Sequence, residues 1–138
     1  MPRVSGSEYR ALGAFRYEIR KFLAFSEHAA REAGIQPKQH QLLLAVRGLP
    51  EGARPTIGTV AERLCVKHHT AVALIDALEK QGLLKRDRSS ADRREVLLVL
   101  TPKGDALLLR LSALHREQLR NVGPLMVTAL QAILDGAS

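Results

Sequence analysis

Four consecutive polar residues carry the hydrogen-bonding side chains that stand out most along this chain: Lys67, His68, His69 and Thr70. Imidazole and hydroxyl groups hydrogen-bond to base edges or phosphates, and a lysine ammonium contacts phosphates. The densest excess of positive charge follows shortly afterwards, between Lys85 and Arg94. Closely spaced Lys and Arg neutralise neighbouring phosphates and release their counterions, although a solvated charged turn has the same pattern. Both segments are therefore candidates for contact with a polyanion.

The overall composition is that of an ordinary globular protein. The chain has 138 residues, of which 46% are hydrophobic and 25% charged, and its formal net charge is +7. This length suits one domain, and the net charge by itself implies only weak attraction to polyanions. Three Phe, two Tyr and no Trp argue against a protein that stacks single-stranded bases on aromatic platforms.

The sequence also favours a location in the cytoplasm. No apolar run approaches the roughly 20 residues that a membrane-spanning helix requires, and the first ten residues do not resemble a signal peptide. The single cysteine, Cys65, excludes an internal disulfide framework and fits a reducing environment. We therefore expect a cytoplasmic protein with no membrane partner.

Two helices are predicted ahead of the polar segment. In the first, over residues 8–33, apolar side chains recur every three or four positions, as in an amphipathic helix. These side chains are Tyr9, Leu12, Phe15, Ile19, Phe22, Leu23 and Ala30. The charged residues between them are expected to face water: Glu18, Arg20, Lys21 and Glu27. The second helix begins at Pro37, and its nearly continuous apolar run from Leu42 to Leu49 predicts deep burial.

The polar segment itself opens the second of two short, adjacent helices. Thr56 is a good N-cap for a helix over Ile57–Leu64, and Cys65-Val66 forms a tight connection to a helix over residues 67–81. At 100° per residue one side of the later helix should pack inward: Ala71, Leu74, Ile75 and Leu78. The opposite side is His69, Ala73, Asp76 and Lys80. This spacing is typical of a helix-turn-helix, whose second helix contacts base edges with its first turn.

Two β-prone stretches, Leu83–Asp87 and Glu95–Leu100, follow that helix and predict a hairpin with a long basic tip over residues 88–94. A hairpin in this place would lie as a wing beside the helix. Its tip arginines would then reach phosphates or a narrow minor groove.

The last third of the chain predicts two further helices. Thr101-Pro102 is an N-cap followed by proline at the first helical position, Gly123-Pro124 is expected to end that helix, and Leu125 to Leu134 form another. The terminal helices present leucine-rich faces yet form no obvious third layer over the central segment. We therefore expect a two-fold homodimer, with a soluble monomer as the alternative.

Three motifs in register resemble the MarR family of transcriptional regulators. They are Ile35-x-Pro37-x-Gln39-His40-x-Leu42-Leu43, Leu78-Glu79-x-x-Gly82-Leu83-Leu84, and Asp92-x-Arg94 followed by Leu100-Thr101 and Gly104. The resemblance covers roughly residues 8–135. It implies a mainly α fold with a small β-hairpin wing (α+β), in which a winged helix-turn-helix core over residues 35–103 is flanked by dimerisation helices over 1–34 and 104–138.

The same resemblance implies a homodimer that binds a pseudo-palindromic operator in double-stranded DNA, usually as a repressor. It assigns the DNA contacts to Lys67, His68, His69, Thr70, Ala73, Arg88, Asp92, Arg93 and Arg94. Arg94 would probe the minor groove while Asp92 holds its guanidinium in a bidentate pair. The chain departs from the family at Lys67, where a small polar residue is common, and at Ala73, where arginine is common. We therefore expect His68 and His69 to make most of the base contacts, so the operator sequence cannot be inferred from the operators of relatives.

The family also releases DNA on binding a small, commonly phenolic or anionic, ligand. The resemblance places the effector crevice at Phe15, Arg16, Ile19 and His40. An arginine beside an apolar crevice suits an anionic aromatic ligand, although all four residues also fit plain core packing.

Other functions remain as alternatives. Cys65 is either an oxidant-sensing thiol or, as we favour, a small buried residue that fills the turn. Zinc sensing would need ligands such as His28, His40 and His115, whereas the adjacent His68 and His69 point too far apart to share one metal. We expect neither a metal nor a cofactor. No phosphate-binding glycine loop, nucleophile elbow or zinc-protease motif is present, which excludes the common enzyme classes and leaves a winged helix for protein or RNA contacts as the other reading.

Overall fold

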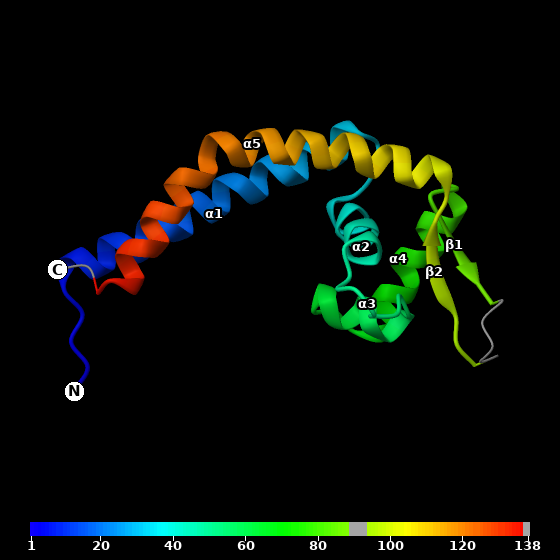
Figure 1. Cartoon of the computed structure of the whole chain (residues 1–138), viewed down its shortest axis with the longest axis horizontal. Coiled ribbons are helices and arrows are strands. Elements are labelled where there is room, and N and C mark those ends of the chain that lie inside the picture. The colour runs from blue at the N-terminus through cyan, green and yellow to red at the C-terminus, as the bar shows by residue number, and fades with distance from the viewer. Residues whose placement is uncertain (89–93, 137–138) are drawn as a thin grey trace. The chain divides into compact units, whose positions relative to one another are not determined.

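The fold is known from a computed structural model that describes residues 1–88 and 94–136. The helices and strands in chain order are α1 (Gly6–Glu32), α2 (Pro37–Arg47), α3 (Ile57–Leu64), α4 (His68–Lys80), β1 (Leu84–Asp87), β2 (Leu97–Leu100) and α5 (Pro102–Leu134) (Figure 1). The chain forms two compact units, one of Met1–Ala29 with Ser112–Ser138 and one of Ala30–Leu111. This mainly helical fold with one hairpin confirms the predicted fold class. In the described part of the chain, no helix is both long and apolar enough to cross a membrane.

In the first unit, α1 and α5 lie side by side and run in opposite directions (Figure 1). His115 of α5 shares a 2.8 Å hydrogen bond between its Nε2 and the Oγ of Ser26. Its imidazole also meets the rings of Phe22 and Phe25 edge-on, at centroid distances of 5.9 and 5.4 Å. Around His115, α1 and α5 are therefore held together by one hydrogen bond and two edge-on aromatic contacts.

The buried face of α1 differs from the expected one. Glu18 is only 9% exposed, whereas Tyr9 and Leu23 of the predicted apolar stripe are 65% and 50% exposed. The buried and half-buried positions instead follow steps of three and four residues through Ala11, Phe15, Glu18, Phe22, Ser26 and Ala29. The prediction that Glu18 faces water is wrong because the helix packs along this row, which mixes small, aromatic and polar side chains. Lys21 compensates the carboxylate through a 3.1 Å contact between its Nζ and Oε1 of Glu18.

The expected sixth helix is also wrong, because α5 continues through Gly123 and Pro124 to Leu134. A proline inside a helix removes one backbone hydrogen bond and often bends the helix rather than ending it. Ala129 beyond the proline is buried, so the continuing helix keeps a packed face that helps to offset that loss.

The second unit holds the larger apolar core. Its most buried side chains come from α2, α3, α4, the hairpin and the start of α5: Leu42, Leu43, Val60, Ile75, Leu78, Leu84, Leu98 and Leu111. The second helix is less buried than predicted, because Leu44 is 43% exposed and only one side of this short helix packs on its neighbours.

The hairpin is shorter than predicted but has an additional partner. Its antiparallel register runs from Leu84 opposite Leu100 to Asp87 opposite Leu97. Beyond that, Thr56 bridges to Leu97, and the N–H of Leu98 donates to the carbonyl of Pro55 at 2.8 Å. The segment that leads into α3 therefore attaches directly to β2, at the end of this strand nearest the tip of the hairpin.

Candidate nucleic-acid interface

The turn between α3 and α4 positions the polar segment. The hydroxyl of Thr56 accepts a hydrogen bond from the N–H of Thr59 at 3.2 Å, which caps the start of α3 as predicted. At the other end Cys65 adopts a left-handed backbone with φ 56° and ψ 42°, and the N–H of Val66 returns to the carbonyl of Ala61 at 3.0 Å. This left-handed residue reverses the chain within two residues and starts α4 at a new angle.

Cys65 does not fill the turn as we expected. It is exposed, whereas its neighbours Leu64 and Val66 are half-buried. The reason is conformational, since the residue that ends a helix in the left-handed region lies beyond the last packed turn. Such a backbone costs roughly 1 kcal/mol in any residue other than glycine.

The orientation of α4 confirms the helical reading of its faces. Ala71, Ile75 and Leu78 are buried, and the opposite side is exposed at His69, Ala73, Asp76 and Lys80. Leu74, the remaining expected core position, is half-buried. The helix therefore packs on the rest of the second unit with one side and leaves the other side exposed.

The first turn of α4 is exposed, and its backbone N–H groups have no side-chain cap. Lys67 is the N-cap residue, and its side chain makes no capping hydrogen bond. Lys67, His68 and His69 are exposed, and Thr70 is half-buried. Amide groups at a helix start point outward and carry the positive end of the helix dipole, so they attract phosphates. Three exposed side chains of types that can hydrogen-bond to bases or phosphates thus surround a helix end that itself favours an anion.

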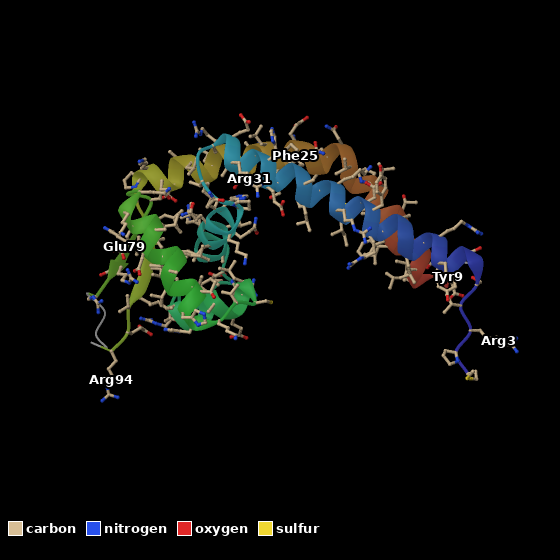
Figure 2. The ribbon with its side chains drawn as sticks, turned by 180° about the vertical axis from the view of Figure 1, so that it is seen from behind. Arg3, Tyr9, Phe25, Arg31, Glu79 and Arg94 are labelled. Carbon is tan, nitrogen blue, oxygen red and sulfur yellow. The ribbon has the colours of Figure 1, made fainter. Side chains whose placement is uncertain are left out.

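The hairpin carries exposed arginines where the tip begins and ends. Arg88 follows β1, and Arg94 projects away from the second unit on the segment that returns to β2 (Figure 2). Asp92 and Arg93, and with them the expected pairing of Asp92 with Arg94, lie outside the described residues. A hollow of about 350 Å³ has both His68 of α4 and Arg94 in its lining, together with Thr56 and Gly58 at the start of α3. The tertiary structure therefore brings residues of the wing and of α4 to one surface.

Two sets of ion pairs hold the hairpin in place. The guanidinium of Arg54 is bidentate on Glu95, because Nη2 donates to Oε1 while Nε donates to Oε2 at 3.0 Å. In β1, Arg86 contacts Asp76 at 2.8 Å and also Glu79, both on α4. Sequence reasoning missed these residues, and no local pattern pairs Arg54 with a carboxylate 41 positions away.

The start of α5 is fitted against the segment between α4 and β1. The hydroxyl of Thr101 donates to the carbonyl of Gly82 at 2.6 Å and accepts from the N–H of Gly104 at 3.1 Å. A Cβ at Gly104 would lie 2.0 Å from the carbonyl oxygen of Leu83. Only glycine permits this approach, which fixes the direction in which the hairpin leaves α4.

The four residues expected at an effector crevice lie in different units. Phe15 and Ile19 are half-buried and Arg16 is exposed on α1, whereas His40 is buried on α2 in the second unit. His40 lies near the amide of Gln41, with 3.4 Å between Nδ1 and Nε2. Their shared role in binding a ligand stays a prediction. Within residues 1–88 and 94–136, no group of three His, Cys, Asp or Glu could hold a metal ion.

A hairpin that packs beside the second helix of a helix-turn-helix defines a winged helix-turn-helix protein. Residues 33–95 match the model of the MarR family. The chain is 30% identical over 111 residues to YkoM of Bacillus subtilis (strain 168), an uncharacterized HTH-type transcriptional regulator, covering 77% of this chain and 69% of YkoM. The chain therefore belongs to the MarR family of transcriptional regulators.

Solved structures show the same fold. The transcriptional repressor CouR, bound to a 23-mer DNA duplex, is 28% identical with a TM-score of 0.67 over 97% of this chain and 99% of CouR. AbsC, a MarR family regulator from Streptomyces coelicolor, shares 19% identity with a TM-score of 0.71 over 88% of this chain and 81% of AbsC. These relatives are regulators rather than enzymes, which agrees with the exclusion of the enzyme classes.

Proposed function

We propose that this regulator binds a specific sequence in double-stranded DNA and acts as a repressor. The exposed first turn of α4 carries the proposal, because it presents Lys67, His68 and His69 at a helix start with no side-chain cap. In this role the histidines and Thr70 contact base edges in the major groove, and Lys67 contacts a phosphate. The DNA duplex bound to CouR and its description as a repressor support the same role here.

The hairpin supplies the second set of DNA contacts in this proposal. Arg88 and Arg94 flank its tip, and the ion pairs of Arg54 with Glu95 and of Arg86 with Asp76 hold the hairpin against the rest of the second unit. Arginines held at a fixed distance from α4 can reach the phosphates or the minor groove next to the major-groove site. Asp92, Arg93 and the exposed Ala73 complete the proposed DNA surface.

The functional form is a homodimer. In the first unit, many large apolar side chains are exposed: Tyr9, Leu12, Tyr17, Leu23, Leu114, Leu119, Leu125, Val127, Leu130 and Leu134. A monomer rarely exposes so many apolar groups on one pair of helices. A two-fold axis would cover them with a second copy and match a pseudo-palindromic operator. Residues 1–34 and 104–138 are thus proposed as the dimerisation segments and residues 35–103 as the DNA-binding lobe.

Release of DNA by a small aromatic or anionic ligand completes the proposal, with Phe15, Arg16, Ile19 and His40 as the effector residues. In this proposal the protein is cytoplasmic, the compartment that contains its operator DNA.

Fluorescence anisotropy tests the central claim. Tiled duplexes from upstream of the protein's own gene are titrated at two salt concentrations, with a random duplex as the reference. We expect one tile to bind preferentially and its affinity to fall steeply with salt. His69→Ala should reduce the preference for that tile, whereas Lys80→Ala, about 16 Å further along α4, should not. Equal binding of all tiles would refute sequence-specific recognition.

A further inference from the structure

The start of β2 is held along both of its edges. One edge pairs with β1. Toward the other edge, the N–H of Leu98 donates to the carbonyl of Pro55 at 2.8 Å, and Thr56 forms a bridge with Leu97. The backbone groups of successive residues in a strand point to alternate edges, so β2 lies between β1 and residues 54–56.

An ion pair extends this attachment to the residue next to Arg94. Nη2 and Nε of Arg54 donate to the two carboxylate oxygens of Glu95, which fixes the two planar groups relative to each other. The side chain of Glu95 is 21% exposed and that of Arg54 57%. Glu95 directly follows Arg94, whose side chain projects away from the second unit (Figure 2). The pair therefore fixes the chain one residue away from this arginine.

Glu95 is a carboxylate in a place where DNA phosphates would approach. It lines the hollow of about 350 Å³ together with Arg94 and His68, both assigned to DNA in the proposed function. A carboxylate there repels phosphates and attracts the neighbouring guanidinium of Arg94. Arg54 compensates this charge from outside the lining. Glu95 thus serves as an anchor for the wing, with its charge balanced by Arg54.

We infer that Arg54 and Glu95 are positioning residues that hold Arg94 at the minor groove and thereby set a preference for A·T pairs at the ends of the operator. This inference rests on the proposed function. A guanidinium fits the narrow minor groove of A·T-rich DNA, and the N2 amino group of guanine changes that surface. Discrimination requires a guanidinium held at a fixed depth, whereas a displaced one contacts phosphates of any sequence.

The DNA test is fluorescence anisotropy of the full chain with the duplex preferred among the tiles. Each flanking A·T pair is replaced in turn by G·C or by inosine·C. Inosine lacks the N2 amino group, so inosine·C presents the minor groove of A·T and the major groove of G·C. We expect G·C at one flanking position to weaken binding by about fivefold or more, and inosine·C there to bind like A·T. Equal affinity for all three flanks would overturn the inference.

Two variants break the ion pair from opposite sides. Glu95→Gln keeps the size of the side chain and removes its charge, and Arg54→Met removes the partner. Each should bring the A·T to G·C affinity ratio at that flank close to one, while the preference at central positions stays. The double variant should lose no more discrimination than either single variant, because both act through one pair.

The sign of the Glu95→Gln effect separates positioning from simple charge. Removing a negative charge near DNA would by itself tighten binding to every duplex. Tighter binding with an unchanged flank ratio would therefore overturn the inference, and so would independent effects of the two substitutions. The matched control is Arg47→Met, which breaks another exposed ion pair of the second unit, with Asp105. It should leave the flank ratio as in the wild type.

A measurement without DNA tests the positioning directly. The backbone ¹H–¹⁵N heteronuclear NOE of Arg94 reports motion on the picosecond to nanosecond timescale. It should fall in Arg54→Met and in Glu95→Gln and stay unchanged in Arg47→Met. An unchanged NOE in the first two variants would overturn the positioning role. A wild-type protein that prefers no duplex would contradict the proposed function, whereas the NOE comparison would still decide whether the pair holds Arg94.

Discussion

Gly104→Ala tests whether the close contact between α5 and the end of α4 positions the hairpin. The added Cβ would lie 2.0 Å from the carbonyl oxygen of Leu83 and 3.0 Å from its carbonyl carbon. Relieving the first contact requires a shift of about 1 Å, which is an overpacking strain of roughly 1–3 kcal/mol. Leu83 is 3% exposed, so the strain passes into the core rather than into solvent.

Two smaller effects partly cancel in this variant. The shift weakens the 3.2 Å hydrogen bond from the N–H of Thr101 to the carbonyl of Leu83, a loss of about 1 kcal/mol. Alanine in place of glycine favours a helix by up to about 1 kcal/mol, and less in the first turn. We therefore expect Gly104→Ala to lower the free energy of unfolding by about 1–3 kcal/mol.

Urea unfolding followed by circular dichroism measures this loss, with every variant at the same protomer concentration because a dimer's stability depends on it. Gly58→Ala is the control, since Gly58 is exposed and an added Cβ there has no atom within 4 Å. Its effect should stay within about 0.5 kcal/mol. If Gly104→Ala is as stable as the wild type and binds the same duplex equally well, this contact does not position the hairpin.

Four other predictions follow from the structure. Arg86→Ala removes the contacts to Asp76 and Glu79 and leaves two carboxylates close together, so stability should fall by about 1 kcal/mol in urea unfolding and DNA affinity should fall with it. Cys65→Gly relieves the left-handed backbone and should raise the free energy of unfolding by about 0.5–1 kcal/mol; a lower stability would show that the side chain matters more than φ. Lys67→Ala should reduce the slope of log affinity against log salt by about one without changing the preferred duplex, and an unchanged slope would argue against a phosphate contact. Leu125→Glu should produce a 15.2 kDa species in sedimentation at low micromolar concentration, and an unchanged dimer would place the interface elsewhere.

Local signals in the sequence were sufficient for the helix-turn-helix. The bounds of α3 match the prediction because Thr56 caps its start, and that cap depends only on a residue three positions later. The exposed and buried faces of α4 followed from helical periodicity, since one element packs against one core. The pair Thr101-Pro102 likewise marked the start of α5, where the hydroxyl of Thr101 accepts the expected cap bond from the N–H of Gly104.

Local signals were misleading where packing between distant segments decides the outcome. The apolar pattern of α1 predicted that Glu18 faces water, yet Glu18 is buried. Apolar and polar side chains are mixed around α1, so its own sequence does not specify which side is buried. Packing against α5 decides this. The proline in α5 was read as a helix end, although a packed face beyond it keeps the helix continuous.

The sequence by itself determined which short segments form helices, where α3 and α5 are capped and which side of α4 is exposed, because these depend on neighbours within one or two turns. The tertiary structure alone decided what holds the wing, through the pairs of Arg54 with Glu95 and of Arg86 with Asp76. Contacts across tens of residues depend on the path of the backbone, and nothing in the local pattern of any one segment encodes that path.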